Sequence, residues 1–248
     1  MKAIFLLILF LSSCSLFACD LTVRLEEYSA QSQIKHNKWQ GLDVELTQLL
    51  LDEAKCRYTF EALPWGRSLK LLADGQIDMM LTVSKTPERT AYAHFIGPQR
   101  QETLVFASKQ MNNEVSSFDK LFALPLPFAV QRDAFYGEAF EHALNRDPSR
   151  KQQVIFVTDN QSKVALLKSN RISGYLEAKL NIIFEMEHVD ELADLQIHPL
   201  VVNQAPVYYA FSKKSVSKRT LIKLSEAYYR LKKQNKFKKL LAKYQLVF

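Results

Sequence analysis

The chain has 248 residues, a hydrophobic content of 48% and a formal net charge of +7. This composition excludes a low-complexity or disordered protein, and the length fits one large domain or two of ordinary size. The charge is uneven, because twelve Lys or Arg residues and one acid, Glu226, lie between residues 213 and 243. We interpret this stretch as the solvated face of an amphipathic helix, although anionic lipid or nucleic acid would also suit it.

The first eighteen residues have the pattern of a secretory signal peptide. Lys2 precedes an apolar run over residues 3–11, and small residues lead to Ala18, after which we expect cleavage. The run is too short to span a bilayer, and no later stretch reaches about 18 uncharged apolar residues. We therefore expect a soluble periplasmic protein that does not bind nucleic acid. Leu11-Ser12-Ser13-Cys14 also resembles a bacterial lipobox, so a lipoprotein anchored at Cys14 stays the alternative.

Cleavage after Ala18 leaves two cysteines, Cys19 and Cys56, in an oxidising compartment. A disulfide between them closes a 37-residue loop, which the chain-entropy model values at about 4 kcal/mol. We expect this bond to form and to hold the N-terminal strand in place.

The first half of the mature chain alternates predicted strands and helices. A helix opens at Gly41, and a second helix over 68–74 is stopped by Gly75. The predicted strands are residues 21–25, 58–62 and 77–83. Strands that alternate with helices are the signature of a parallel α/β sheet.

The second half repeats this alternation without a fixed short repeat. Its predicted helices are residues 118–122, 136–145 and 161–169, and its predicted strands are residues 128–131, 154–158, 171–176 and 207–211. Two amphipathic helices end the chain. Because no Pro/Gly-rich linker separates the halves, we expect two α/β lobes joined by strands that pass directly between them, near 104–109 and 203–208.

The segment from Thr82 to Arg89 carries the clearest functional signal. It follows a predicted buried strand, and ligands of open α/β sheets bind at the carboxyl ends of strands. Thr86 and Pro87 suit the start of a helix, whereas a cation such as Arg89 is mildly unfavourable in a first helical turn. A bound carboxylate would resolve this conflict, because it would meet free backbone N–H groups, the hydroxyls of Ser84 and Thr82, and the Arg89 guanidinium. The alternative is that Arg89 pairs with a surface acid.

Five segments in order resemble the bacterial extracellular solute-binding proteins of family 3, the periplasmic amino-acid-binding components of ABC importers. Each segment alone is a weak match, but together they cover essentially the whole mature chain. They are Gly41–Leu46, Pro64–Arg67, Gly75–Asp78, Thr86–Arg89 and the ending from Tyr208–Lys214 to Lys243-Tyr244.

The resemblance implies a type II periplasmic-binding-protein fold. Each lobe is then a mainly parallel sheet flanked by helices, and two crossover strands join the lobes. We expect lobe 1 to be discontinuous, over residues 19–107 and 206–248, with lobe 2 over residues 108–205 and the signal peptide over 1–18.

The resemblance also implies site residues in the first lobe. Arg89 falls where the family has its carboxylate-clamping arginine, and Ser84 and Thr82 fall where it has hydroxyl or backbone donors. Trp65 and Tyr28 fall at aromatic positions that contact the ligand side chain. The alternative for these two aromatics is ordinary packing between sheet and helix.

The second lobe departs from the family pattern. Where amino-acid binders have a Gly-Ser-Thr-like turn, this chain has Arg132–Phe135, and where they have the acid that holds the ligand ammonium, it has Ala178. Glu177, one residue earlier, or Asp133 could replace that acid, or the ligand could lack an ammonium group. Strand side chains alternate faces, so a one-residue offset matters.

Other chemistry has weak support in the sequence. None of the six glycines forms a phosphate-binding loop, and no nucleophile motif is present. The only cluster that resembles metal ligands, Glu185–Asp190, is interpreted as a solvated acidic segment. We therefore predict no cofactor and no metal.

The sequence thus predicts a monomeric, non-enzymatic receptor that captures a small carboxylate-bearing solute for an inner-membrane ABC permease. Two alternatives remain open. One is an accessory or sensory binding protein without its own importer. The other is a dehydratase-like enzyme on the same fold, with Glu177 or Asp133 as its general acid.

Overall fold

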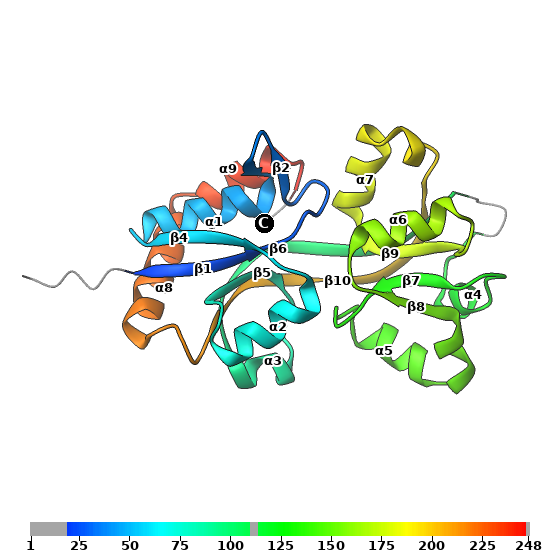
Figure 1. Cartoon of the computed structure of the whole chain (residues 1–248), viewed down its shortest axis with the longest axis horizontal. Coiled ribbons are helices and arrows are strands. Elements are labelled where there is room, and N and C mark those ends of the chain that lie inside the picture. Colours follow the sequence, from blue (N-terminus) through cyan, green and yellow to red (C-terminus); the bar gives the residue numbers. More distant parts are fainter. Residues whose placement is uncertain (1–18, 110–113, 247–248) are drawn as a thin grey trace, which may run out of the picture.

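A computed structural model describes residues 19–109 and 114–246 of the chain (Figure 1). The predicted signal peptide, and with it the proposed lipid-anchored Cys14, lies outside these residues. Within them, no helix has both the length and the apolar character needed to cross a membrane.

Two lobes lie side by side, connected by two long strands (Figure 1). The connecting strands are β6 (Ala93–Ser108) and β10 (Gln196–Ser212). The first lobe contains β1 (Asp20–Leu25), β2 (Gln33–Lys35), β3 (Lys38–Gln40), α1 (Leu42–Glu53), β4 (Arg57–Ala62), α2 (Trp65–Asp74), β5 (Met79–Val83), α3 (Pro87–Tyr92), α8 (Lys218–Lys233) and α9 (Lys236–Ala242). The second contains α4 (Phe118–Phe122), β7 (Phe128–Gln131), α5 (Glu138–Asn145), β8 (Val154–Val157), α6 (Asn160–Lys168), β9 (Gly174–Ala178) and α7 (Lys179–His188), with short 3₁₀ helices at Pro148–Gln153 and Asp190–Leu192.

One sheet runs through both lobes in the order β4-β1-β5-β10-β6-β9-β7-β8. The outer strands of each lobe pair in parallel, and β6 and β10 pair with each other in antiparallel fashion from Ala93↔Ser212 to Gln196↔Ser108. The predicted α/β fold with two crossover strands is therefore confirmed. Both strands start well before the predicted crossover segments, and β10 also ends after its segment. β10 pairs with β5 in the first lobe, and β6 pairs with β9 in the second.

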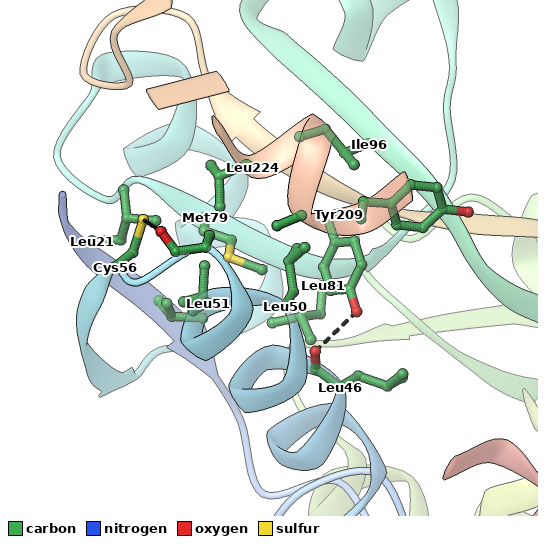
Figure 2. Close-up of a cluster of buried hydrophobic side chains, with 14 of the residues drawn as sticks. Leu21, Leu46, Leu50, Leu51, Cys56, Met79, Leu81, Ile96, Tyr209 and Leu224 are labelled. Atoms are coloured by element: carbon green, nitrogen blue, oxygen red, sulfur yellow. Dashed lines mark hydrogen bonds between the residues drawn. The ribbon is translucent and has the colours of Figure 1, made fainter. Parts of the chain in front are cut away.

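The core of the first lobe lies between the sheet and α1, α8 and α9. Figure 2 shows part of it, where the Tyr209 hydroxyl donates a 3.0 Å hydrogen bond to the Leu46 carbonyl. Cys19 and Cys56 form a disulfide just before the paired strands β1 and β4. This bond therefore fixes the N-terminal edge of the sheet, as the sequence suggested.

Gly41 shows why the chain needs a glycine before α1. Its φ of 119° is unfavourable for other residues, and a Cβ there would lie 2.6 Å from the Gln31 carbonyl oxygen. The close approach brings the loop after β1 against the start of α1. Both segments border the cavity described below.

Helix α7 was not predicted, and the interpretation of residues 185–190 as a solvated acidic segment is wrong at Glu185. Helical spacing places Asn181, Ile182 and Glu185 on the buried side of α7. The Glu185 carboxylate accepts hydrogen bonds from the Tyr175 hydroxyl at 2.7 Å and the Ser29 hydroxyl at 2.6 Å. These distant partners, which local sequence does not reveal, explain how an acid is accommodated there.

Candidate functional site

A cavity lies between the lobes, where the carboxyl ends of β1 and β5 meet the crossover strands and the second lobe. Its volume is about 70 Å³, enough for several water molecules. The lining residues are Arg24, Leu25, Glu26, Tyr28, Gln31, Ser32, Asp43, Trp65, Leu81, Thr82, Ser84, Arg89, Glu102, Leu104, Gln131, Ala134, Phe135, Tyr136 and Glu177. Five of the predicted first-lobe site residues and Glu177 are therefore brought together, whereas Asp133 is not in the lining.

Arg89 lies at the start of α3 and lines the cavity. The Thr86 side chain caps this helix by accepting the Arg89 backbone N–H, as its sequence position predicted. The Arg89 side chain is 6% exposed and donates to the Ser84 carbonyl at 3.1 Å and the Asp133 carbonyl at 3.0 Å. Among the described residues, no acid lies within ion-pair distance of it. Burial lowers the pKa of Arg89, as expected for a guanidinium without a close anion.

Ser84 and Thr82 lie at the end of β5, on either side of Val83. Ser84 holds Arg89 through its carbonyl, and its side chain borders the cavity. Thr82 has an unusual φ of 57°, a backbone conformation that concentrates at functional sites when a β-branched residue adopts it. Its hydroxyl donates to Asp43 Oδ2 at 3.0 Å. This bond directs the hydroxyl hydrogen of Thr82 to Asp43 and leaves the Thr82 oxygen at the cavity wall.

Trp65 begins α2 and closes one side of the cavity. Its indole N–H donates to the Asp133 carbonyl at 3.0 Å, so it contacts the second lobe directly. The guanidinium carbons of Arg24 and Arg89 lie 5.3 Å and 5.7 Å from its ring centroid, within cation–π range. The ring therefore helps to position both cations as well as to border the cavity.

Asp133 connects the lobes through its backbone. Its carbonyl accepts the bonds from Arg89 and Trp65, while the residue itself is exposed and its carboxylate packs against Gly66. Its φ of 61° turns the chain tightly after β7. Asp133 therefore contacts the first lobe through its backbone carbonyl. Asp133 is not among the residues that line the cavity.

Glu177 is 2% exposed and fully engaged by protein groups. Its Oε2 pairs with the buried Lys163 ammonium at 2.7 Å, and its Oε1 accepts from Tyr28, from the Ala178 N–H at 2.6 Å and from Asn181 at 3.2 Å. Tyr28 belongs to the first lobe, so this bond joins the lobes. Glu177 therefore lies in the cavity wall as the centre of a buried ion pair.

Several charged residues in the cavity wall were not identified from the sequence. Burial raises the pKa of Glu26, Asp43 and Glu102. Arg24 also lines the cavity, and it forms an ion pair with Glu26. Glu26 directly follows the first strand, and ligands of open α/β sheets bind at the carboxyl ends of strands. Its place in the cavity wall could therefore have been predicted from the sequence. Glu102 had none, because its burial depends on the crossover strand extending back beyond the predicted segment.

The described residues contain no group of three or more His, Cys, Asp or Glu side chains that could hold a metal ion. The cavity wall offers hydrogen-bonding and charged groups. It combines donors, acceptors and both signs of charge with the apolar surfaces of Trp65, Leu104 and Phe135. Such a mixture is typical of small-molecule sites.

Solved structures of known proteins share this fold. An ancestral arginine-binding protein bound to arginine aligns with a TM-score of 0.76 and 17% identity, over 91% of this chain and 97% of that chain. A histidine kinase sensor domain with similarity to periplasmic binding proteins aligns at 0.75 and 16%, over 92% and 95%. The ancestral amino-acid-binding protein AncCDT-1, a precursor of cyclohexadienyl dehydratase, aligns at 0.74 and 19%, over 91% and 95%.

Among curated proteins, no relative matches this chain. The characteristic sequence pattern of one family, however, matches residues 21–247, which is nearly the whole described chain. This match agrees with the two-lobed fold and with the cavity between the lobes. The chain therefore belongs to the bacterial extracellular solute-binding proteins, family 3.

Proposed function

We propose that this protein captures a small polar solute bearing a carboxylate, such as an amino acid, between its lobes in the periplasm and presents it to an ABC-type importer. No covalent step is involved. The observation that carries the proposal is the Arg89 guanidinium, which borders the interlobe cavity without an acidic partner among the described residues.

Electrostatics favour an anion at this position. Arg89 uses two of its five N–H donors on carbonyl oxygens and also interacts with the Tyr92 hydroxyl, so at least one donor is available to another group. A carboxylate would neutralise the buried charge and accept charge-assisted hydrogen bonds, which are stronger than neutral ones. Ser84 would add a hydroxyl donor beside the guanidinium.

The second lobe would complete the site by closing over the solute. The Asp133 carbonyl and Glu177 already receive hydrogen bonds from the first lobe, at Arg89, Trp65 and Tyr28. Closure of two lobes around a ligand is a common hinge motion, and it buries the solute between both sets of groups. The closed form would be the one that a permease recognises.

A thermal-shift screen tests the binding proposal. Protein stripped of bound solute by denaturation and refolding is mixed with each of the twenty standard L-amino acids and with small carboxylic acids. We expect at least one of them to raise the melting temperature, because a ligand that binds only the folded state stabilises it. No shift with any of these compounds would contradict the proposal.

Arg89→Met tests the role of the guanidinium in the same screen. Loss of two charge-assisted bonds should weaken binding by about 3 kcal/mol or more, which is over 100-fold in Kd. Arg67→Met is the matched control, because Arg67 is an exposed arginine on the neighbouring helix α2. If Arg89→Met and Arg67→Met bind the solute with equal affinity, Arg89 does not contribute to solute binding.

A sensory role without an importer is the second candidate, and α8 offers a surface on which its membrane partner would dock. Helix α8 exposes Ile222 and Tyr229, at 53% and 67%, on a helix rich in lysine and arginine. A pull-down with the double variant Ile222→Ser/Tyr229→Ser separates the candidates. Loss of a membrane-protein partner other than an ABC permease, with solute binding unchanged, would favour the sensory role.

A further inference from the structure

We propose that Asp43 is the acid that pairs with a cationic group of the bound solute, so that the solute is a zwitterion held between Arg89 and Asp43. This inference rests on the proposed function and specifies its ligand. It places the counter-acid on the first lobe, at the start of α1, whereas the family resemblance implied an acid on the second lobe.

A comparison of the charges in the cavity wall identifies Asp43. Four carboxylates border the cavity, and three of them have a cationic partner: Glu26 pairs with Arg24, Glu102 with Arg100 at 3.0 Å, and Glu177 with Lys163 at 2.7 Å. Among the described residues, Asp43 alone of these four forms no ion pair.

The two oxygens of Asp43 differ in their surroundings. Oδ2 accepts the Thr82 hydroxyl at 3.0 Å, whereas Oδ1 is buried and has no hydrogen-bond partner. The side chain is 7% exposed and borders the cavity. Burial raises the pKa of Asp43 even though Arg100 and Arg24 oppose this effect, so the nearby cations do not compensate for the lost hydration. A buried oxygen of this kind is unfavourable unless a donor reaches it.

Asp43 and Arg89 border the same cavity and are held by neighbouring parts of its wall. Asp43 is bonded to the Thr82 hydroxyl, and Arg89 is bonded to the Ser84 carbonyl. The Cα atoms of Thr82 and Ser84 are two residues apart and so at most about 7 Å from each other, which places both bonds in one short stretch of the wall. Gln31 adds a buried, unpaired Nε2 donor to the same wall, which suits an oxygen of the solute.

The second-lobe acids are poor alternatives to Asp43. Glu177 already accepts hydrogen bonds from four protein groups, and the Asp133 carboxylate lies outside the cavity wall. A purely local role for Asp43 is the competing explanation, because an acid in the first turn also stabilises a helix. That role predicts no dependence of solute selectivity on Asp43.

Matched pairs of compounds distinguish these explanations. Each amino acid that binds the stripped wild-type protein is compared, by isothermal titration calorimetry, with the carboxylic acid in which hydrogen replaces its α-amino group. We expect the wild type to bind the amino acid at least tenfold more tightly than the matched acid. Asp43→Asn, which keeps an acceptor for Thr82 but removes the charge, should lose most of this preference.

Asp52→Asn is the control, because Asp52 is an exposed acid on the same helix α1 and its variant should behave like the wild type. If Asp43→Asn does not fold, Asp43→Ser replaces it, since serine also offers Thr82 an uncharged acceptor. An unchanged preference in the folded variant, or equal binding of both compounds by the wild type, would overturn the role of Asp43 and leave the proposed function intact. Failure of every amino acid and every small carboxylic acid to bind would overturn both, whereas binding of carboxylic acids alone would overturn only the role of Asp43.

Discussion

At the scale of single residues, the cavity wall is notable for charged groups that are buried but mostly satisfied by one another. Lys163 is 1% exposed and pairs with Glu177, which also holds Tyr28 from the other lobe. Removing one member of a buried pair leaves an uncompensated charge, which is far more destabilising than the pair is stabilising.

Lys163→Met should therefore lower the free energy of unfolding by about 3–5 kcal/mol. The double variant Lys163→Met/Glu177→Gln should recover much of this loss, because it leaves no unpaired charge. Chemical denaturation of the wild type, both single variants and the double variant measures the coupling. Additive effects of the two substitutions would show that the pair is not energetically coupled.

The raised pKa of Asp43 gives a prediction about pH. Because the folded-state pKa lies above the ordinary value of 3.8, the solute-free protein loses stability as the pH rises from 3.8 through that folded-state pKa, and the penalty is then constant at higher pH. The stability of Asp43→Asn relative to wild type should therefore increase as the pH rises from 4 to 8.

Melting temperatures of both proteins across this range test the sign. The charged and titratable groups that act on Asp43 are Arg24, Arg100, Glu102, Tyr209 and Tyr244, and all are retained in the variant. Their own titrations therefore largely cancel in the difference. A difference that is constant between pH 4 and pH 8 would contradict the raised pKa.

At the scale of secondary-structure elements, the loop after β1 connects the first lobe to β9 and α7 of the second. Tyr28 donates to Glu177 at the end of β9, and Ser29 donates to Glu185 on α7 at 2.6 Å. Figure 1 shows this loop beside α7. Both bonds cross between the lobes, so they stabilise the arrangement in which the lobes are in contact. Glu185 contributes to this contact although it is not among the residues that line the cavity.

The double variant Tyr28→Phe/Ser29→Ala should shift the lobes toward an open arrangement. Hydrogen bonds to charged groups contribute about 1.5–3 kcal/mol each, so their loss should increase the radius of gyration in small-angle X-ray scattering. Tyr58→Phe is the control, since Tyr58 bonds Asp52 within the first lobe. Scattering curves that are identical for the double variant and the control would exclude this role for the two hydroxyls.

The sequence predicted those elements whose signals are local. Thr86 and Pro87 mark the start of α3, and Gly75 ends α2 in a left-handed conformation, because capping and glycine chemistry depend on adjacent residues. The burial of Glu185 depends on its hydrogen bond with Ser29, which lies 156 residues away. The sequence around Glu185 therefore could not show that this acid lies on the buried side of a helix.

The candidate site divides in the same way. The cavity position of Arg89 followed from its unfavourable place at a helix start after a buried strand, which is a local conflict. The unpaired oxygen of Asp43 and the complete pairing of Glu177 depend on which side chains meet from both lobes. Neither could be read from sequence spacing.

At the scale of the whole molecule, the two crossover strands and the disulfide organise the first lobe around its N-terminal strand. The disulfide lies beside the first residue pair of β1 and β4, Asp20↔Arg57. The loop that it closes contains α1, which carries Asp43, so the bond constrains one wall of the cavity as well as the chain terminus.

Cys19→Ser/Cys56→Ser should lower the free energy of unfolding by about 4 kcal/mol, from the loop entropy of a 37-residue separation. Denaturant titrations with and without a reductant measure this. The reductant should bring the wild type to the level of the variant and leave the variant unchanged. A wild type that is insensitive to full reduction would show that the bond contributes little.

The most direct test of solute capture is a crystal structure of the protein with the amino acid that binds most tightly. We predict that the ligand lies between the lobes, with its carboxylate oxygens within about 3 Å of the Arg89 guanidinium nitrogens. A ligand bound elsewhere, or one in the cavity whose carboxylate does not contact Arg89, would contradict the central claim.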